Sequence, residues 1–361
     1  MKTHLLRTTS TVALVVSIFN SSLSHAAGDG NNGVSGKIGG KIYTDWSIAL
    51  EQSETEAGED TTLVSHGFAN HRAYFGYKMT IVNRFIGCVM LDVGRVDEVT
   101  DLETSVDETS GNISAISTSH DHRLEAYAKY AYLEMKEVLP RTSMTLGLRG
   151  RRQFKLQEKF WGYRYVYKSF MDANKYGSSA DLGFGIAVEP FDQLSVYLDV
   201  DNGEGYKKLQ MDDNYKGSLG IQAKPTGILD LYAYVDAMPV DKNDQAIQYT
   251  VAGFAGIRPV DAFRLGLEYD YQANTKGVEG SALNGISVFG IVVPWKVLEI
   301  FARFDMLSTD DYETTSKLAI GGVQIAPHGQ FKIAPNVQVS IPEGDDLKPT
   351  TRIAASAMFK F

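Results

Sequence analysis

The feature that most constrains this chain is a two-residue alternation of apolar and polar side chains, repeated in segments of about ten residues as far as the last residue. In residues 263–271, FRLGLEYDY, one face holds only apolar or aromatic side chains and the other holds charged residues or glycine. Residues 194–201 and 337–341 alternate in the same way. Because side chains of a strand point to opposite faces in turn, the pattern predicts many β-strands with one apolar face each.

Alternation alone does not separate a soluble β-sandwich from a transmembrane β-barrel, because the strands of both have one apolar face. The lengths of the connections do separate them. Tight turns, such as 82–84 and 190–192, alternate strictly with longer polar connections at 50–68, 97–120, 152–177, 203–212, 239–246, 273–282, 308–314 and 342–349. Short turns at one rim and long loops at the other are typical of bacterial outer-membrane barrels.

The sequence therefore predicts an all-β fold, a transmembrane antiparallel β-barrel of sixteen strands. An even number of strands returns both chain ends to the same side of the membrane. The expected strands are 37–49, 69–82, 85–96, 121–136, 141–151, 178–189, 193–202, 213–224, 228–238, 247–258, 262–272, 283–293, 296–307, 315–326, 331–341 and 350–361.

The first residues combine a basic start (Lys2, Arg7), a short apolar run at 12–19 and a small-residue stretch at 24–27. This three-part pattern predicts a secretory signal peptide over residues 1–26, cut after Ala26 or Ala27, followed by the barrel over residues 27–361. The apolar run is shorter than the roughly 18–20 residues of a membrane-spanning helix, and no later stretch reaches that length without a charge. A helical membrane protein is therefore excluded.

Aromatic residues give the barrel a predicted orientation. The chain ends in Phe361 after alternating apolar residues, which resembles the assembly signal of outer-membrane barrels. The expected register places Tyr130 and Tyr132 on the lipid face near the turn rim, and Trp46, Tyr269 and Tyr271 on the lipid face near the loop rim. These residues would form the two aromatic girdles of a transmembrane barrel.

A sixteen-stranded barrel is wide enough to enclose an aqueous channel, whereas eight strands enclose only side chains. The expected inward face is strongly charged, which suits a wall in contact with water better than a dry core. We expect these wall charges to be solvated: Lys41, Asp45, Arg72, Lys78, Asp92, Arg123, Glu125, Lys129, Asp181, Asp199, Lys216, Glu268, Asp270, Arg303, Asp305 and Arg352.

The third long connection, with its flanks at 149–175, is basic in a chain whose net charge is −9. It also carries seven aromatic side chains, and a segment with so much apolar surface tends to pack against another surface. In a wide barrel the available surface is the inner wall. Eight basic residues oppose only Glu158 and Asp172: Arg149, Arg151, Arg152, Lys155, Lys159, Arg164, Lys168 and Lys175.

Folded inward, this segment would narrow the channel and concentrate a positive potential there, which raises the local concentration of anions. The sequence thus predicts an anion-favouring constriction built from the eight basic residues. The alternative is a basic strip at the rim that contacts lipopolysaccharide phosphates.

Six motifs lie in about the first half of the mature chain: GGKIY at 39–43, RAYFG at 72–76, AYLE at 131–134, 146–155, FWGYR at 160–164 and SSADLG at 178–183. Together they resemble porins related to the phosphate-selective porin family. The resemblance implies a sixteen-stranded, often trimeric outer-membrane channel with a long third loop in the lumen. This sequence departs from the family in the many acidic residues among its inward positions, so general anion preference is expected and phosphate specificity is not.

Other signals are weak. Cys88 is alone and cannot form an internal disulfide, and the negative net charge argues against a nucleic-acid partner. The acidic stretches at 50–68 and 97–108 are interpreted as solvated loops, with Ca²⁺ or Mg²⁺ that bridges to lipopolysaccharide as the alternative, and they lack the spacing of a calcium loop. His120-Asp121-His122 alternates faces, so no metal or cofactor is predicted. A structural or adhesion barrel without transport, or a barrel enzyme such as a phospholipase or protease, remains the alternative to a channel for small hydrophilic solutes.

Overall fold

The computed structural model describes residues 33–55, 58–95, 99–106, 113–120, 124–208, 213–239, 246–309, 314–342 and 348–361. Within these ranges sixteen strands form one closed antiparallel barrel, and two further strands pair as a separate hairpin. The predicted fold class is therefore confirmed. The predicted signal peptide, residues 1–26, lies outside the described ranges, as does Arg123.

Each expected strand corresponds to one strand of the barrel. The barrel strands are β1 (Val34–Thr55), β2 (Gly58–Ile81), β3 (Phe85–Arg95), β6 (Leu124–Leu139), β7 (Thr142–Gly150), β8 (Ala180–Phe191), β9 (Leu194–Asp201), β10 (Lys216–Thr226), β11 (Leu229–Pro239), β12 (Ile247–Val260), β13 (Phe263–Ala273), β14 (Ala282–Trp295), β15 (Leu298–Thr309), β16 (Thr314–His328), β17 (Phe331–Ile341) and β18 (Thr350–Lys360).

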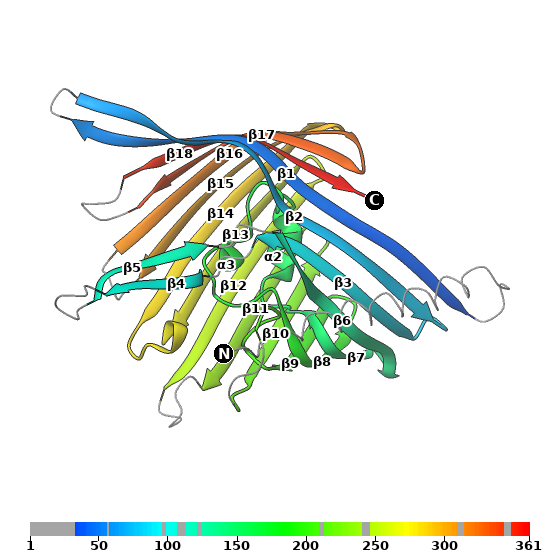
Figure 1. Ribbon diagram of the computed structural model, residues 1–361. Helices are drawn as coiled ribbons and strands as arrows, with labels where there is room; N and C mark the ends of the chain where they lie inside the picture. The colour runs from blue at the N-terminus through cyan, green and yellow to red at the C-terminus, as the bar shows by residue number, and fades with distance from the viewer. Residues whose placement is uncertain are drawn as a thin grey trace.

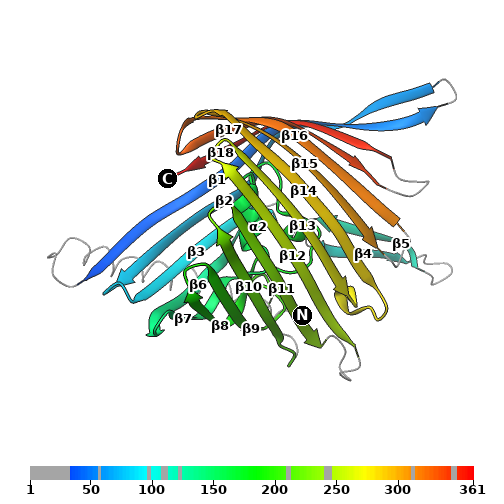
Figure 2. The same cartoon turned by 180° about the vertical axis from the view of Figure 1, so that it is seen from behind.

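The last strand closes the barrel against the first. β18 pairs antiparallel with β1 from Lys41 opposite Lys360 to Glu51 opposite Thr350. The closing ladder ends where Gly40 and Phe361 exchange two backbone hydrogen bonds of 3.1 and 3.2 Å. Figures 1 and 2 show the resulting ring of tilted strands from both sides. Closure leaves no barrel edge unpaired, which matters because unpaired backbone groups in hydrocarbon cost several kcal/mol each.

The outer surface is apolar, as the alternation predicts. On β13, Leu265, Leu267 and Tyr269 are exposed on the outside, whereas Glu268 and Asp270 are buried inside. Trp46 is also exposed on the outer face. At the turn rim the exposed outer aromatic side chains are mostly phenylalanines, including Phe85, Phe191, Phe263, Phe331, Phe359 and Phe361.

The lipid-facing positions predicted for Tyr130 and Tyr132 are wrong. A register shift between Met90 and Leu91 leaves Lys129 as an extra residue on β6, a β-bulge. Beyond the bulge Tyr132 lies opposite Cys88, which in turn lies opposite the inward Lys78 of β2. The extra residue reverses the alternation, so both tyrosines point into the barrel.

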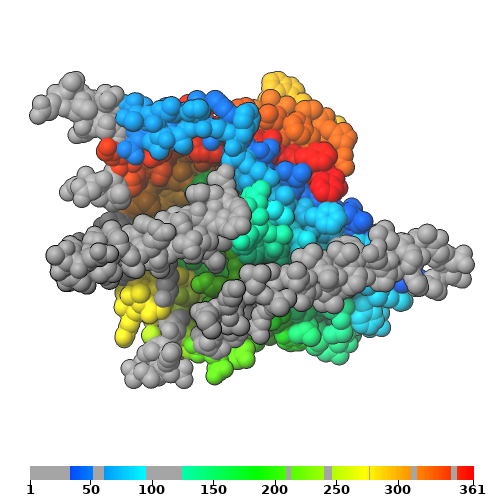
Figure 3. Space-filling view, viewed as in Figure 1, coloured from blue at the N-terminus to red at the C-terminus, as the bar shows by residue number. Residues whose placement is uncertain are grey.

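Two predicted loops are in fact paired strands. β1 and β2 extend as a long hairpin through most of 50–68, visible along the upper edge of the molecule in Figures 1 and 3. Within the predicted loop 97–120, β4 (Val99–Val106) pairs with β5 (Ile113–His120). Pairing gives hydrogen-bond partners to backbone N–H and C=O groups that would otherwise bond to water in an irregular loop. Sequences rich in Thr, Ser and Val favour such strand pairing.

The connection between β7 and β8, residues 151–179, lies inside the barrel, as predicted. It contains two short helices, α2 (Lys155–Trp161) and α3 (Phe170–Ala173), and both views place α2 within the ring of strands. Gly162 ends α2 in the left-handed region, with φ at 80°, where glycine carries no steric cost. A further 3₁₀ turn covers Thr275–Gly277, and none of the described helices is long and apolar enough to span a bilayer.

Candidate functional site

The connection 151–179, called the inner loop below, is fixed to the barrel wall by aromatic packing. Phe160 packs against Phe254 and Phe289, at ring-centroid distances of 5.4 and 6.2 Å. Trp161 packs against Phe289 and Phe301 at 5.2 and 5.8 Å. These five rings are buried, so a hydrophobic core lies inside the barrel between the loop and the wall.

Glycines of the wall make room for this core. A Cβ atom on Gly256 of β12 would lie 2.6 Å from the Phe160 ring, and one on Gly285 of β14 would lie 2.3 Å from the Phe170 ring. Real Cβ atoms do not approach other atoms so closely. The loop aromatics therefore occupy space that only glycine leaves free at these two positions.

Polar side chains fix the backbone of the inner loop at three consecutive carbonyl groups. Gln338 Nε2 donates to the Val166 carbonyl at 3.4 Å, Trp161 Nε1 donates to Tyr167 at 3.0 Å, and Arg303 Nη1 donates to Lys168 at 2.7 Å. Two of these donors come from the barrel wall. The 166–168 segment is thus held in one position, as a preorganised binding element requires.

Two of the eight predicted constriction residues do not present their charge to the lumen. Arg149 and Arg151 are each only 3% exposed. Arg149 lies 3.0 Å from Asp199 and 2.7 Å from Asp201, and Arg151 lies 3.3 Å from Asp236. These arginines form a buried ion-pair network between β7 and its neighbours, so the prediction of a constriction charge is wrong for both.

Arg152 and Arg164 are partly buried and are also engaged with other groups. The Arg152 guanidinium lies 4.3 Å from the centroid of the Tyr197 ring. Arg164 forms ion pairs with Glu158 and Asp172, the two acidic residues of the loop. Burial acts to lower the pKa of Arg164, but the two carboxylates outweigh it and hold that pKa above its ordinary value.

The other four predicted residues keep free charges. Lys155, Lys159, Lys168 and Lys175 are all exposed inside the barrel, and none forms an ion pair within the described part of the chain. Enclosure by the wall lowers the pKa of Lys155, with Arg152 adding to the effect. The same enclosure lowers the pKa of Lys168, and Asp172 partly offsets this effect. Four lysines of the loop therefore supply the positive charge that the sequence predicted for eight residues.

The predicted wall residues divide in the same way. Lys41 and Lys78 are exposed in the lumen. Lys129, Asp181, Lys216 and Arg303 are buried, and Arg72 is partly buried against Asp92 at 3.0 Å. Lys129 reaches Asp92 at 3.3 Å, Lys216 reaches Asp236 at 3.8 Å, and Arg303 is paired with Asp305 at 2.6 Å. The expectation of solvated wall charges is therefore wrong for these residues. Four of the five have ion-pair partners, as buried charges need, and Asp181 accepts hydrogen bonds from the backbone N–H groups of Leu182 and Gly203.

Sequence reasoning predicted Lys41 and Lys78 at the turn end of the lumen but missed three further lysines there, Lys37, Lys332 and Lys360. Lys360 lies directly opposite Lys41 across β18 and β1, and Lys37 lies directly opposite Lys78 across β1 and β2. Lys332, two residues into β17, lies one strand further around the barrel. The alternation of strands 331–341 and 350–361 already placed Lys332 and Lys360 on the inward face, so the signal was present.

Candidate metal sites are absent from the part of the chain whose side chains are described. The acidic stretches 52–60 and 97–108 and the His120-Asp121-His122 motif lie among side chains outside that part. Cys88 is a free, buried cysteine on the inward face of β3.

Comparison with solved structures shows which proteins share this fold. The chain superposes on the anion-selective porin from Comamonas acidovorans with a TM-score of 0.64 at 10% identity, covering 91% of this chain and 100% of that one. The outer membrane channel DcaP of Acinetobacter baumannii superposes with a TM-score of 0.62 at 12% identity, covering 93% of this chain and 100% of that one. OprB of Pseudomonas putida superposes with a TM-score of 0.58 at 8% identity, covering 96% of this chain and 97% of that one.

No protein-family model matches the chain, and no curated protein sequence matches it. At these identities the structural likeness concerns the fold. This chain therefore has the sixteen-stranded barrel fold found in outer-membrane porins.

Proposed function

We propose that the chain forms an outer-membrane diffusion channel for small hydrophilic solutes and that this channel favours anions. The observation that carries the proposal is the inner loop, fixed across a closed sixteen-stranded barrel with four lysines exposed and unpaired within the described part of the chain. A barrel of this strand number encloses an aqueous lumen, and a loop inside it determines which solutes pass.

The distribution of charge supports an anion preference despite the negative net charge of the chain. Inward carboxylates such as Asp92, Asp199, Asp201 and Asp236 are buried and neutralised by arginine or lysine. The exposed charges of the inner loop and the turn end are mostly lysines. A solute in the lumen therefore meets a positive field, which low-dielectric walls strengthen.

Membrane location follows from the outer surface. Exposed leucine, valine, isoleucine and aromatic side chains cover the outside of the barrel, with Trp46, Tyr249 and Tyr269 near the loop rim and phenylalanines at the turn rim. Such a surface suits contact with outer-membrane lipid and lipopolysaccharide. We extend the proposal to a signal peptide over residues 1–26 and to a homotrimer; OmpT of Vibrio cholerae, at a TM-score of 0.57 and 11% identity, has a trimer form.

Planar-bilayer recording tests the proposal. The purified protein is expected to give stepwise conductance, and in a salt gradient its reversal potential is expected to indicate anion preference. Lys155→Glu combined with Lys168→Glu reverses two free charges of the inner loop and is expected to abolish or invert the anion preference. Lys296→Glu, in the exposed turn between β14 and β15, is the matched control and should leave it unchanged.

Two results would contradict the proposal. Absence of stepwise conductance would favour a structural or adhesion barrel. A cation-selective wild-type channel, or an unchanged reversal potential in the double variant, would remove the anion preference. Substitution of Arg149 or Arg151 is a poor test, because it would leave buried carboxylates unpaired and disturb folding.

A further inference from the structure

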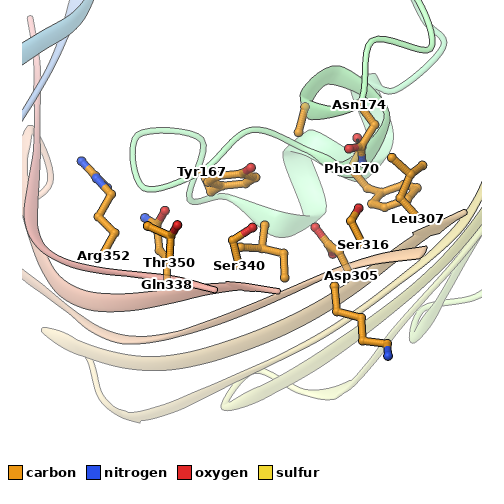
Figure 4. A pocket seen from close by; sticks show the side chains of 13 residues that line it. Tyr167, Phe170, Asn174, Asp305, Leu307, Ser316, Gln338, Ser340, Thr350 and Arg352 are labelled. Carbon is orange, nitrogen blue, oxygen red and sulfur yellow. Dashed lines mark hydrogen bonds between the residues drawn. The ribbon is translucent and has the colours of Figure 1, made fainter. Parts of the chain in front are cut away.

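A cavity of about 340 Å³ separates the inner loop from strands β15–β18. Tyr167, Phe170 and Asn174 of the loop form one side, and the inward residues of the four strands form the floor, as Figure 4 shows. The volume lies in the range of small-ligand pockets, about 300–1,000 Å³.

The floor of the cavity is rich in hydroxyl groups. Ser316 lies opposite Leu307, Ser340 lies opposite Leu318 and Thr350, and Gln338 lies on the same inward face. The hydroxyls of the two serines and of Thr350 make no hydrogen bond to a described residue. A hydroxyl both donates and accepts hydrogen bonds, so this floor matches a ligand whose groups do the same.

Of the charged residues that line the cavity, Asp305 and Arg352 are paired and Lys317 points to the outer face. Arg303 donates to both carboxylate oxygens of Asp305, at 2.8 and 2.6 Å, and Arg352 is paired with Asp45. Lys317 lies opposite Met306 and Ile341, residues of the outer face. The cavity thus offers neither a free cation to attract an anion nor a free anion to attract a cation.

Tyr167 adds an aromatic surface above the hydroxyl-rich floor, seen in Figure 4 over Ser340 and Gln338. Its position is set by the three hydrogen bonds to the 166–168 carbonyls and by Arg303, whose guanidinium lies 5.7 Å from its ring centroid. A fixed ring gives contact area without the entropy cost of ordering a mobile side chain.

From these features we infer that the cavity is a binding site for a neutral, sugar-sized polyhydroxylated solute. A pyranose ring presents C–H groups on its faces and hydroxyls around its edge, which suits an aromatic ring above and hydroxyls below. Phe170 and Leu307 close one end of the cavity with apolar surface. As a step in permeation the site rests on the proposed channel function, whereas binding itself does not depend on conductance.

Glucose titrated into the detergent-solubilised, folded protein tests the inference, with binding followed by saturation-transfer NMR of the sugar C–H protons. Tyr167→Ala is expected to weaken glucose binding by about tenfold or more, because it removes the aromatic surface. Tyr167→Phe keeps the ring and is expected to stay within about twofold of the wild type. Inorganic phosphate is expected not to displace glucose.

A second pair of variants distinguishes a blocked cavity from misfolding of the loop. Ser340→Leu fills the cavity and is expected to abolish glucose binding, whereas Val339→Leu, the neighbouring residue on the outer face, is expected to leave it intact. Lack of glucose binding, equal binding by wild type and Ser340→Leu, or displacement by phosphate would overturn the inference. Binding without bilayer conductance would contradict only the proposed channel; conductance without glucose binding would contradict only the site.

Discussion

Inward-facing aspartates that look alike in the sequence occupy different electrostatic surroundings beneath the inner loop. Asp236 of β11 is 1% exposed and lies 3.3 Å from Arg151 and 3.8 Å from Lys216. Asp270 of β13 is fully buried beside Glu268, and neither forms an ion pair within the described part of the chain. Alternation predicts which way these side chains point, but their partners come from other strands and from the loop.

We therefore expect opposite results from two matched substitutions. Asp236→Asn leaves Lys216 without its carboxylate and leaves Arg151 with only Asp201, at 3.7 Å. It is expected to lower the free energy of unfolding by about 3–5 kcal/mol. Asp270→Asn removes a buried acidic group that has no cationic partner, and it is expected to be neutral or stabilising. The temperature at which the folded band disappears on SDS gels measures both. An equal decrease in the two variants would contradict the assignment of Asp236 as a paired residue and Asp270 as an unpaired one.

At the scale of elements, the inner loop is held by shape as much as by charge. Its aromatic side chains fit over glycines of β12 and β14, and its backbone is bound by Gln338 and Arg303. The sequence predicted that the loop folds inward, since seven aromatic side chains need a surface. It could not predict the two short helices or the glycine contacts, because these depend on which strand the loop meets.

Two glycines of β12 allow the fit to be tested. Gly256→Ala places a methyl group against Phe160 and is expected to displace α2 from the wall, which should raise and scatter the single-channel conductance. Gly253 lies on the same strand, and no described atom lies within 4 Å of a Cβ built there. Gly253→Ala is therefore the control and should conduct as the wild type does. Identical conductance in all three proteins would show that Phe160 does not hold the loop in place.

All sixteen expected strands form, but the predicted direction of the side chains failed on β6, where one residue is inserted. The bulge at Lys129 turned Tyr130 and Tyr132 inward, and a bulge occupies too few residues to be seen as a change of period. The long β1–β2 hairpin was missed for another reason. Within residues 50–68 both faces of the hairpin are polar, so the sequence has no apolar alternation that would predict a strand. Pairing there depends on the partner strand, which neither segment predicts by itself.

At the scale of the whole molecule, the electrostatic field in the lumen comes from the charged side chains that have no ion-pair partner. The sequence predicted eight loop cations and a solvated wall of mixed charge; the fold pairs most of the buried wall charges and leaves lysines exposed on the loop and at the turn end. The net charge of −9 therefore does not describe the lumen. A property of the whole barrel, the anion preference, is expected to depend on a few lysine ammonium groups.

That dependence predicts how selectivity changes with pH. Enclosure by the barrel wall lowers the pKa of Lys155 and Lys168, and a lysine carries its charge only below its pKa. As pH is raised from neutrality toward about 10.4, the pKa of an ordinary lysine, these two residues are expected to lose their charge before an ordinary lysine does, so the anion preference should fall over this range. Reversal potentials in a salt gradient measure this fall.

The control variant is Lys155→Arg combined with Lys168→Arg. It keeps both charges throughout the pH range, because guanidinium stays protonated, and should hold the anion preference constant. A wild-type preference that does not change over the same range, or an arginine variant that changes as the wild type does, would show that these lysines do not set the selectivity.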